Sequence, residues 1–102
     1  MSIEEIAIKK AQQSICKYKV SAIGFDRYGN IIGTAMNKPR FNHVGGSKHA
    51  EMNLMRRYGQ KLKTIIICRS NNSGDIIHID PCDACKRKAD DLGIKIKSIV
   101  EI

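Results

Sequence analysis

Two short stretches decide how this chain folds: HAEMNL at residues 49–54 and DPCDAC at residues 80–85. Each stands where a helical pattern begins, and each carries side chains that bind metals. Zn²⁺ takes imidazole and thiolate ligands in a tetrahedron, and three protein ligands leave the fourth position for water. We therefore predict that His49, Cys82 and Cys85 bind zinc, and that the carboxylate of Glu51 need not be a ligand. This combination favours a hydrolytic zinc site.

The rest of the sequence alternates strands and helices around these two stretches. Hydrophobic spacing predicts helices over residues 3–16 and 48–58 and from Pro81 to Gly93, and strands over residues 18–26, 31–36, 63–69 and 94–97. Residues 27–30 contain Gly and Asn and predict a hairpin turn. Residues 63–69 include three consecutive Ile residues, the pattern of a strand buried on both faces. We expect an α/β fold with parallel pairing, this strand at the sheet centre, and a short hairpin in residues 70–79.

The boundaries of the third helix follow from its flanking residues. Asp80 can cap the helix, Pro81 can occupy its first position, and Gly93 can end it. Two cysteines three residues apart at a helix start share one face, and the positive end of the helix lowers the pKa of a thiol. His49 and Glu51 are two residues apart, so they can act together only where a helix begins.

Length and composition limit the classes of protein. A chain of 102 residues is expected to form a single domain over residues 1–102. No apolar run approaches the roughly 18 residues that span a bilayer, and residues 1–10 lack the apolar core of a signal peptide. We therefore expect no membrane partner, a cytoplasmic location and reduced thiols. The remaining cysteines, Cys16 and Cys68, are interpreted as structural.

The net charge of +8 leaves two interpretations open. The first is an anionic partner such as a nucleic acid, because basic clusters attract phosphate groups. Solvated basic faces that aid solubility are the other. Few aromatic residues and no Trp weaken the case for a platform that stacks single-stranded bases.

The motif His49-Ala50-Glu51 followed by Pro81-Cys82-x-x-Cys85 resembles that of the cytidine deaminase-like superfamily, over about residues 18–102. The resemblance implies a three-layer α/β/α fold with a mixed sheet of about four to five strands flanked by helices. It also implies a Zn²⁺ cofactor, with a zinc-bound hydroxide as nucleophile and Glu51 as the proton shuttle. The substrate implied is a cytosine nucleoside or nucleotide, which becomes the uracil form with release of ammonia.

The resemblance also suggests residues for the substrate. Asn37 matches an asparagine that closes the second strand in many family members and contacts the sugar or base. We place Ala50, Pro81 and His43 beside it as substrate-binding residues. The string Asn37-Lys38-Pro39 is similar to tRNA adenosine deaminases, whereas residues 49–54 are more similar to cytidine and deoxycytidylate deaminases. The sugar, the need for a 5′-phosphate and the identity of the base stay open.

Typical family members continue beyond the point that corresponds to Ile102. We therefore expect a compact version of the fold without that C-terminal extension, and a homo-oligomer in which a second subunit completes the pocket. Two alternatives remain. One is a polynucleotide deaminase, acting on adenosine in tRNA or cytosine in single-stranded DNA. The other is a non-catalytic binding module with a closed zinc site, in which His43, His78 or Cys68 supplies a fourth ligand.

Overall fold

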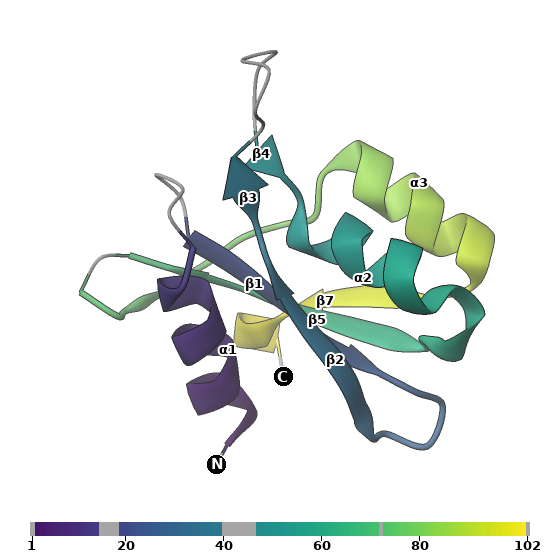
Figure 1. Cartoon of the computed structure of the whole chain (residues 1–102), viewed down its shortest axis with the longest axis horizontal. Helices are drawn as coiled ribbons and strands as arrows, with labels where there is room; N and C mark the ends of the chain where they lie inside the picture. Colours follow the sequence, from purple (N-terminus) through teal and green to yellow (C-terminus); the bar gives the residue numbers. More distant parts are fainter. Residues whose placement is uncertain (1, 15–18, 40–46, 72, 102) are drawn as a thin grey trace.

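The computed structural model describes residues 2–14, 19–39, 47–71 and 73–101, and it shows a mixed β-sheet between helices (Figure 1). The sheet contains β1 (Lys19–Phe25), β2 (Ile31–Met36), β5 (Thr64–Ser70), β6 (Ile76–Ile77) and β7 (Lys95–Ser98). Two short strands, β3 (Lys38–Pro39) and β4 (Ser47–Lys48), pair separately. The helices are α1 (Ile3–Gln12), α2 (Ala50–Tyr58) and α3 (Asp83–Leu92), with 3₁₀ turns at Gly59–Lys61 and Ile99–Glu101.

The order of the strands confirms the predicted mixed sheet and limits parallel pairing to β5 with β7. β1 pairs antiparallel with both β2 and β5, while β5 pairs parallel with β7. The Asp26 carboxylate accepts hydrogen bonds from the backbone N–H groups of Tyr28 and Asn30, both at 2.9 Å. This turn makes β1 and β2 a hairpin, and a hairpin is antiparallel by geometry. β2 and β5 nevertheless run in the same direction on either side of β1, so α2 and α3 each connect two parallel strands.

Successive side chains of the central strand β5 point to opposite faces of the sheet, and they show which helices cover each face. Ile65 and Ile67 are buried in one core cluster with residues of α2 and α3. Ile66 and Cys68 are buried in a second cluster with Ala7 of α1. Figure 1 shows α1 on one side of the sheet and α2 with α3 on the other. The predicted three-layer fold and the predicted central strand are therefore confirmed.

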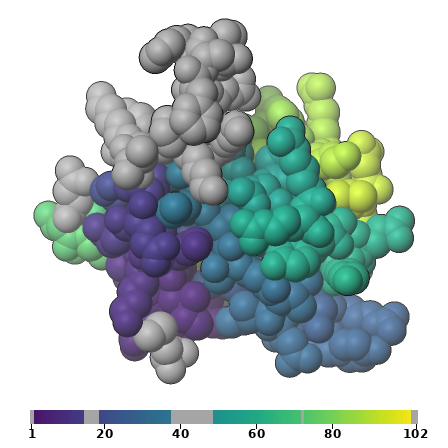
Figure 2. Space-filling view, viewed as in Figure 1, coloured from purple at the N-terminus to yellow at the C-terminus, as the bar shows by residue number. Residues whose placement is uncertain are grey.

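Two glycines bring α2 close to the sheet. Gly24 of β1 lies directly opposite Gly33 of β2 in the register of the hairpin. A Cβ atom at Gly33 would lie only 2.5 Å from the ring of Tyr58 in α2, and one at Gly24 would lie 2.5 Å from a methyl group of Leu62. Their absent side chains let α2 rest on β1 and β2. In the space-filling view β2 lies between α1 and α2 on the face shown (Figure 2).

The ends of the three helices differ from the sequence-based prediction. α1 begins at Ile3 as expected but ends at Gln12 rather than residue 16, and α2 begins at Ala50 rather than residue 48. The cap of α3 is Cys82, because its Sγ accepts the backbone N–H of Cys85 at 3.4 Å. The predicted cap at Asp80 and helical position for Pro81 are therefore wrong.

Other expectations agree with the structure or lie outside it. Residues 76–77 pair antiparallel with the end of β5, which confirms a short hairpin after the central strand. Gly93 ends α3 with a φ of 71°, a left-handed conformation that glycine adopts without strain. Cys16 and His43 lie outside the described residues. None of the helices in the described ranges is long and apolar enough to cross a membrane.

Candidate active site and metal centre

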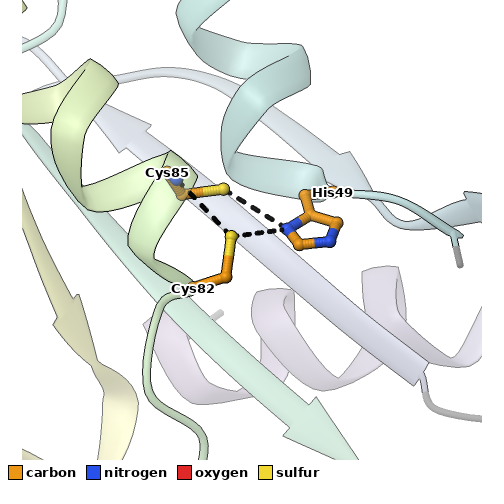
Figure 3. Close-up of side chains that lie close together, drawn as sticks. All are labelled: His49, Cys82 and Cys85. Carbon is orange, nitrogen blue, oxygen red and sulfur yellow. Dashed lines mark hydrogen bonds between the residues drawn. The ribbon is translucent and has the colours of Figure 1, made fainter.

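Three metal-binding side chains converge where α2 and α3 begin. His49 is the N-cap residue of α2, and Cys82 is the N-cap residue of α3, with Cys85 one turn further along. The Nδ1 atom of His49 lies 3.2 Å from Sγ of Cys82 and 3.3 Å from Sγ of Cys85. Figure 3 shows the three side chains pointing toward one another from the two helix starts. All three candidate ligand atoms lie within 4.8 Å of one another.

The geometry and chemistry of this cluster fit a zinc ion. Ideal tetrahedral bonds to one nitrogen and one sulfur would separate those two atoms by about 3.5 Å, close to the distances found. Two thiolates also balance the charge of a divalent ion, and a neutral imidazole adds none. Of the His, Cys, Asp and Glu residues that the structure describes, only His49, Cys82 and Cys85 form such a group. The cluster therefore offers three ligands, the number found in catalytic zinc sites.

Burial governs the pKa of one thiol of this cluster, that of Cys85. Desolvation raises the pKa of the Cys85 thiol well above its usual value, and the nearby Glu51 carboxylate and Cys82 raise it further. A metal ligand must be a thiolate, so zinc binding has to displace this proton. The positive charge of the ion reverses the effect of burial, because it favours the ionised sulfur. Cys85 is thus a site where metal binding and proton release are linked.

Glu51 lies beside the cluster without belonging to it. It occupies the first turn of α2, two residues after His49, and only 4% of its surface is exposed. Its carboxylate lies close enough to the Cys85 thiol to raise the pKa of that thiol, yet it is absent from the group of mutually close ligand atoms. A buried carboxylate next to a metal site, and not needed as a ligand, is suited to moving protons.

A cavity of about 180 Å³ opens beside these residues. Its walls come from the starts of both helices, from the segment before α3, from the start of β1 and from the residue that follows β2. They comprise Val20, Asn37, His49, Ala50, Glu51, Ile79, Asp80 and Cys82. The structure therefore brings together Glu51, two of the predicted zinc ligands, and the predicted substrate-binding residues Asn37 and Ala50. Those two roles in substrate binding stay predictions.

Hydrogen bonds to the scaffold fix the orientation of Asn37. Its Oδ1 accepts the backbone N–H of Val20 at 3.0 Å and the hydroxyl of Ser14 at 2.7 Å. Its own backbone N–H donates to the carbonyl oxygen of Val20 at 3.0 Å. The side chain thus closes the β1–β2 ladder and is 96% buried at the cavity wall. Such a residue presents a fixed amide to whatever enters the cavity.

The other residues singled out in the sequence lie elsewhere. Pro81 lines a different groove of about 330 Å³, between α3 and β7. Cys68 lies on the α1 face of the sheet, and His78 is exposed and paired with Asp80 at 3.2 Å. Neither belongs to the metal-binding group, so of the three fourth ligands considered, these two are wrong. His43 is outside the described residues.

Three residues of the cavity wall were not predicted for the site. Ile79 and Asp80 precede the Pro81-Cys82 motif directly, so their proximity to it in sequence was an available signal. Nothing in the sequence around Val20 indicates a place in the site, because only the pairing of Asn37 with β1 brings Val20 to the cavity wall. Asp80 was interpreted as a helix cap, which obscured its place at the cavity.

The comparisons with known proteins agree with this geometry. The family model for the cytidine and deoxycytidylate deaminase zinc-binding region matches residues 2–100. A search of curated proteins gave no significant match. Solved structures give clear matches at low sequence identity, and this likeness supports the fold.

Cytidine deaminases from three organisms illustrate this likeness. The enzyme from Burkholderia pseudomallei is 17% identical with a TM-score of 0.68, covering 97% of this chain and 87% of that one. The enzyme from Mycobacterium leprae is 20% identical with a TM-score of 0.64, covering 91% and 82%. The enzyme from Mycobacterium tuberculosis is 17% identical with a TM-score of 0.57, covering 98% and 88%. The family model matches nearly the whole chain and the cluster supplies ligands suited to Zn²⁺, so this chain belongs to the cytidine and deoxycytidylate deaminase zinc-binding family.

Proposed function

We propose that this chain is a zinc-dependent hydrolase that deaminates a cytosine nucleoside or nucleotide to its uracil form. One observation supports this reaction above the others. The Glu51 carboxylate is buried in the cavity wall beside three metal-binding side chains that leave it uncoordinated. A structural zinc site does not need a carboxylate that is not a ligand, whereas a hydrolytic deaminase needs one as its general acid and base.

Each residue of the site has a role in this proposal. His49, Cys82 and Cys85 hold the zinc ion, which when bound lowers the pKa of a water ligand to about 7. Glu51 takes one proton from the attacking water and delivers it to the ring nitrogen of the base. It then passes the second proton of that water to the amino group, which leaves as ammonia. Overall, water replaces the amine at C4 of cytosine. Asn37 and Ala50, which both line the cavity, orient the base, with Pro81 and His43 as further predicted contacts.

The decisive experiment separates the alternative substrates. Zinc-loaded protein is incubated with cytidine, deoxycytidine, their monophosphates, cytosine, guanine, tRNA and single-stranded DNA, and released ammonia and the changed base are measured. We expect turnover of a cytosine nucleoside or mononucleotide and none in the Glu51→Gln variant. Zinc-loaded protein that turns over no cytosine compound would contradict the proposal.

One observation favours a second candidate, a polynucleotide substrate. Lys86, Lys95 and Lys97 surround the groove between α3 and β7, which also includes Pro81 next to the site. A phosphodiester backbone in this groove would make binding fall steeply with salt, by close to one unit of logarithmic slope per phosphate contact. Charge reversal at Lys86 and Lys97 would then weaken binding of tRNA or DNA. We expect instead that these changes leave nucleoside turnover nearly unaltered.

Location and assembly complete the proposal. A cytoplasmic location would keep Cys82 and Cys85 reduced and able to bind zinc. We also propose a homo-oligomer in which a second subunit completes the cavity, since the wall described here encloses only about 180 Å³. Light scattering of the zinc-loaded protein tests the assembly: a monomer at the concentrations used for the activity assay would contradict it.

A further inference from the structure

Asp80 gives the cavity an acidic edge that the reaction itself does not require. It lines the same cavity as Glu51 and Asn37, while 71% of its side chain remains exposed. Its Oδ1 atom lies 3.2 Å from Nε2 of His78. Asp80 neither belongs to the metal-binding group nor caps α3. A carboxylate therefore stands where the buried cavity meets solvent, with no role in the proposed proton transfers.

The size of the cavity indicates what would lie near this carboxylate. Pockets that enclose a drug-sized ligand usually measure about 300–1,000 Å³, and this one measures about 180 Å³. A pyrimidine base fits such a volume, but a whole nucleoside does not. With the amino group of the base directed at Glu51 and the zinc ligands, the sugar must extend toward the mouth. Asp80 stands at that mouth, within reach of the sugar and its 5′ substituent.

We propose that Asp80 is a specificity-determining residue that makes this site select uncharged cytosine nucleosides over their 5′-monophosphates. This inference rests on the proposed function and settles which of its two substrate classes the site prefers. The exposed carboxylate repels a phosphate dianion and accepts hydrogen bonds from sugar hydroxyl groups. It acts on recognition alone, since it holds neither the metal nor the reacting base.

The expected size of the preference follows from electrostatics. A carboxylate and a phosphate dianion about 8 Å apart in a water-like medium repel enough to change affinity about three- to ten-fold at low ionic strength. Salt at 0.15 M or more screens charges at this distance, because the Debye length is then about 8 Å or less. The preference for nucleoside should accordingly shrink as salt is added.

The test compares kcat/KM for cytidine and cytidine 5′-monophosphate, and for the deoxy pair, in the wild-type and Asp80→Asn proteins. We expect the nucleoside-to-monophosphate ratio to fall about three- to ten-fold in the variant. We further expect the wild-type ratio to decrease with added salt and the variant ratio to stay flat. Asp91→Asn is the matched control, because it removes an equal charge from an exposed position of α3 that lines none of the cavities described.

A binding measurement separates recognition from turnover. In the zinc-loaded Glu51→Gln background, calorimetry should show that Asp80→Asn strengthens binding of the monophosphate more than binding of the nucleoside. A wild-type protein that prefers the monophosphate, or a ratio that Asp80→Asn leaves unchanged, would overturn the inference while leaving the deaminase assignment intact. An equal fall in kcat/KM for both substrates would give Asp80 a structural role and would also overturn the inference. Absence of any cytosine turnover would instead refute the proposed function on which it rests.

Discussion

Each face of the central sheet carries a cluster of buried side chains, yet among the described residues only one face holds a metal-binding group. Cys68 and Cys85 show the difference, since both side chains are fully buried. Cys68 lies on the α1 face among Ala7, Ile23 and Ile66. Cys85 lies on the α2–α3 face, next to His49, Cys82 and Glu51. A buried thiol therefore becomes a candidate metal ligand through its neighbours and not through burial.

The connections of the chain explain the asymmetry. α2 and α3 each follow a strand of the sheet, so both begin at the edge where β2 and β5 end. Their N-termini bring unpaired backbone N–H groups and positive dipole ends to one place, which favours negative charge there and opposes part of the burial effect that raises the pKa of Cys85. α1 precedes the sheet, and on its face the described residues add only the 3₁₀ turn at Ile99–Glu101. That face is joined to α1 by apolar packing and by the hydrogen bond that the Ser21 hydroxyl donates to the Ala7 carbonyl oxygen at 2.7 Å.

The largest effect is expected from removing one cysteine of the pair. Cys85→Ser should lose zinc and turnover together, because a serine hydroxyl is a poor substitute for a thiolate on zinc. It should also unfold more easily, since bound metal contributes folding free energy. Cys68→Ala is the matched control and should keep one zinc per chain. Zinc content by mass spectrometry or atomic emission checks this, and a full zinc content after removing both Cys82 and Cys85 would contradict the ligand assignment.

Glu51→Gln should lower turnover without loss of zinc. The amide preserves the shape of the side chain but cannot carry a proton, and loss of a general acid-base typically costs about 10²- to 10⁴-fold in rate. Ammonia release and zinc content measured on one preparation give both quantities. Loss of zinc in this variant would make Glu51 a ligand, and near-normal turnover would exclude it as the proton shuttle.

The close approach of α2 gives a prediction of intermediate size. Gly33→Ala should destabilise the protein by about 1–3 kcal/mol, because the new Cβ would press on the Tyr58 ring 2.5 Å away. Chemical denaturation measures this change. In a Tyr58→Leu background the same substitution should cost less, since the shorter side chain leaves room. An equal loss of stability from Gly33→Ala in the two backgrounds would show that Tyr58 does not limit how closely α2 approaches the sheet.

The smallest effect is a change in the free energy of unfolding at alkaline pH, and it comes from Cys68 on the α1 face. Burial raises the pKa of the Cys68 thiol above its ordinary value of 9.0. The unfolded chain therefore loses this proton at lower pH than the folded chain. The resulting stability is complete below about pH 9 and is lost as pH rises toward the folded pKa, by at most about 1.4 kcal/mol per pH unit.

Thermal unfolding of the zinc-saturated protein at pH 8, 9 and 10 tests this linkage. Cys68→Ala should show a shallower loss of stability than the wild type across that range, because the variant has no thiol to ionise on unfolding. Zinc saturation keeps Cys82 and Cys85 as thiolates, so they contribute little to the difference. Parallel curves for the two proteins would show that Cys68 is not shielded from solvent as the structure indicates.

Local patterns predicted most of the elements and missed some of their ends. The run of Ile residues identified the central strand, because only a strand covered on both faces is apolar throughout. The cap of α3 was misplaced, since Asp80 is the better capping residue by type. Cys82 takes the cap because its sulfur accepts the Cys85 N–H at the metal site. The turn at residues 27–30 predicted the antiparallel pairing of β1 with β2, whereas the pairing of β1 with β5 joins residues far apart in the chain and no local pattern encodes it.

The sequence alone determined the chemistry available to this protein. His49, Glu51, Cys82 and Cys85 are identifiable because few residue types bind zinc or carry protons, and their spacing placed them at helix starts. Only the tertiary structure decided which groups meet. It separated Cys68 from the site, brought Val20 and Asp80 to the cavity, and turned the Asn37 side chain onto the backbone of β1. The reason is that side-chain chemistry is a local property, whereas proximity between distant residues depends on how the strands pair and which face each residue occupies.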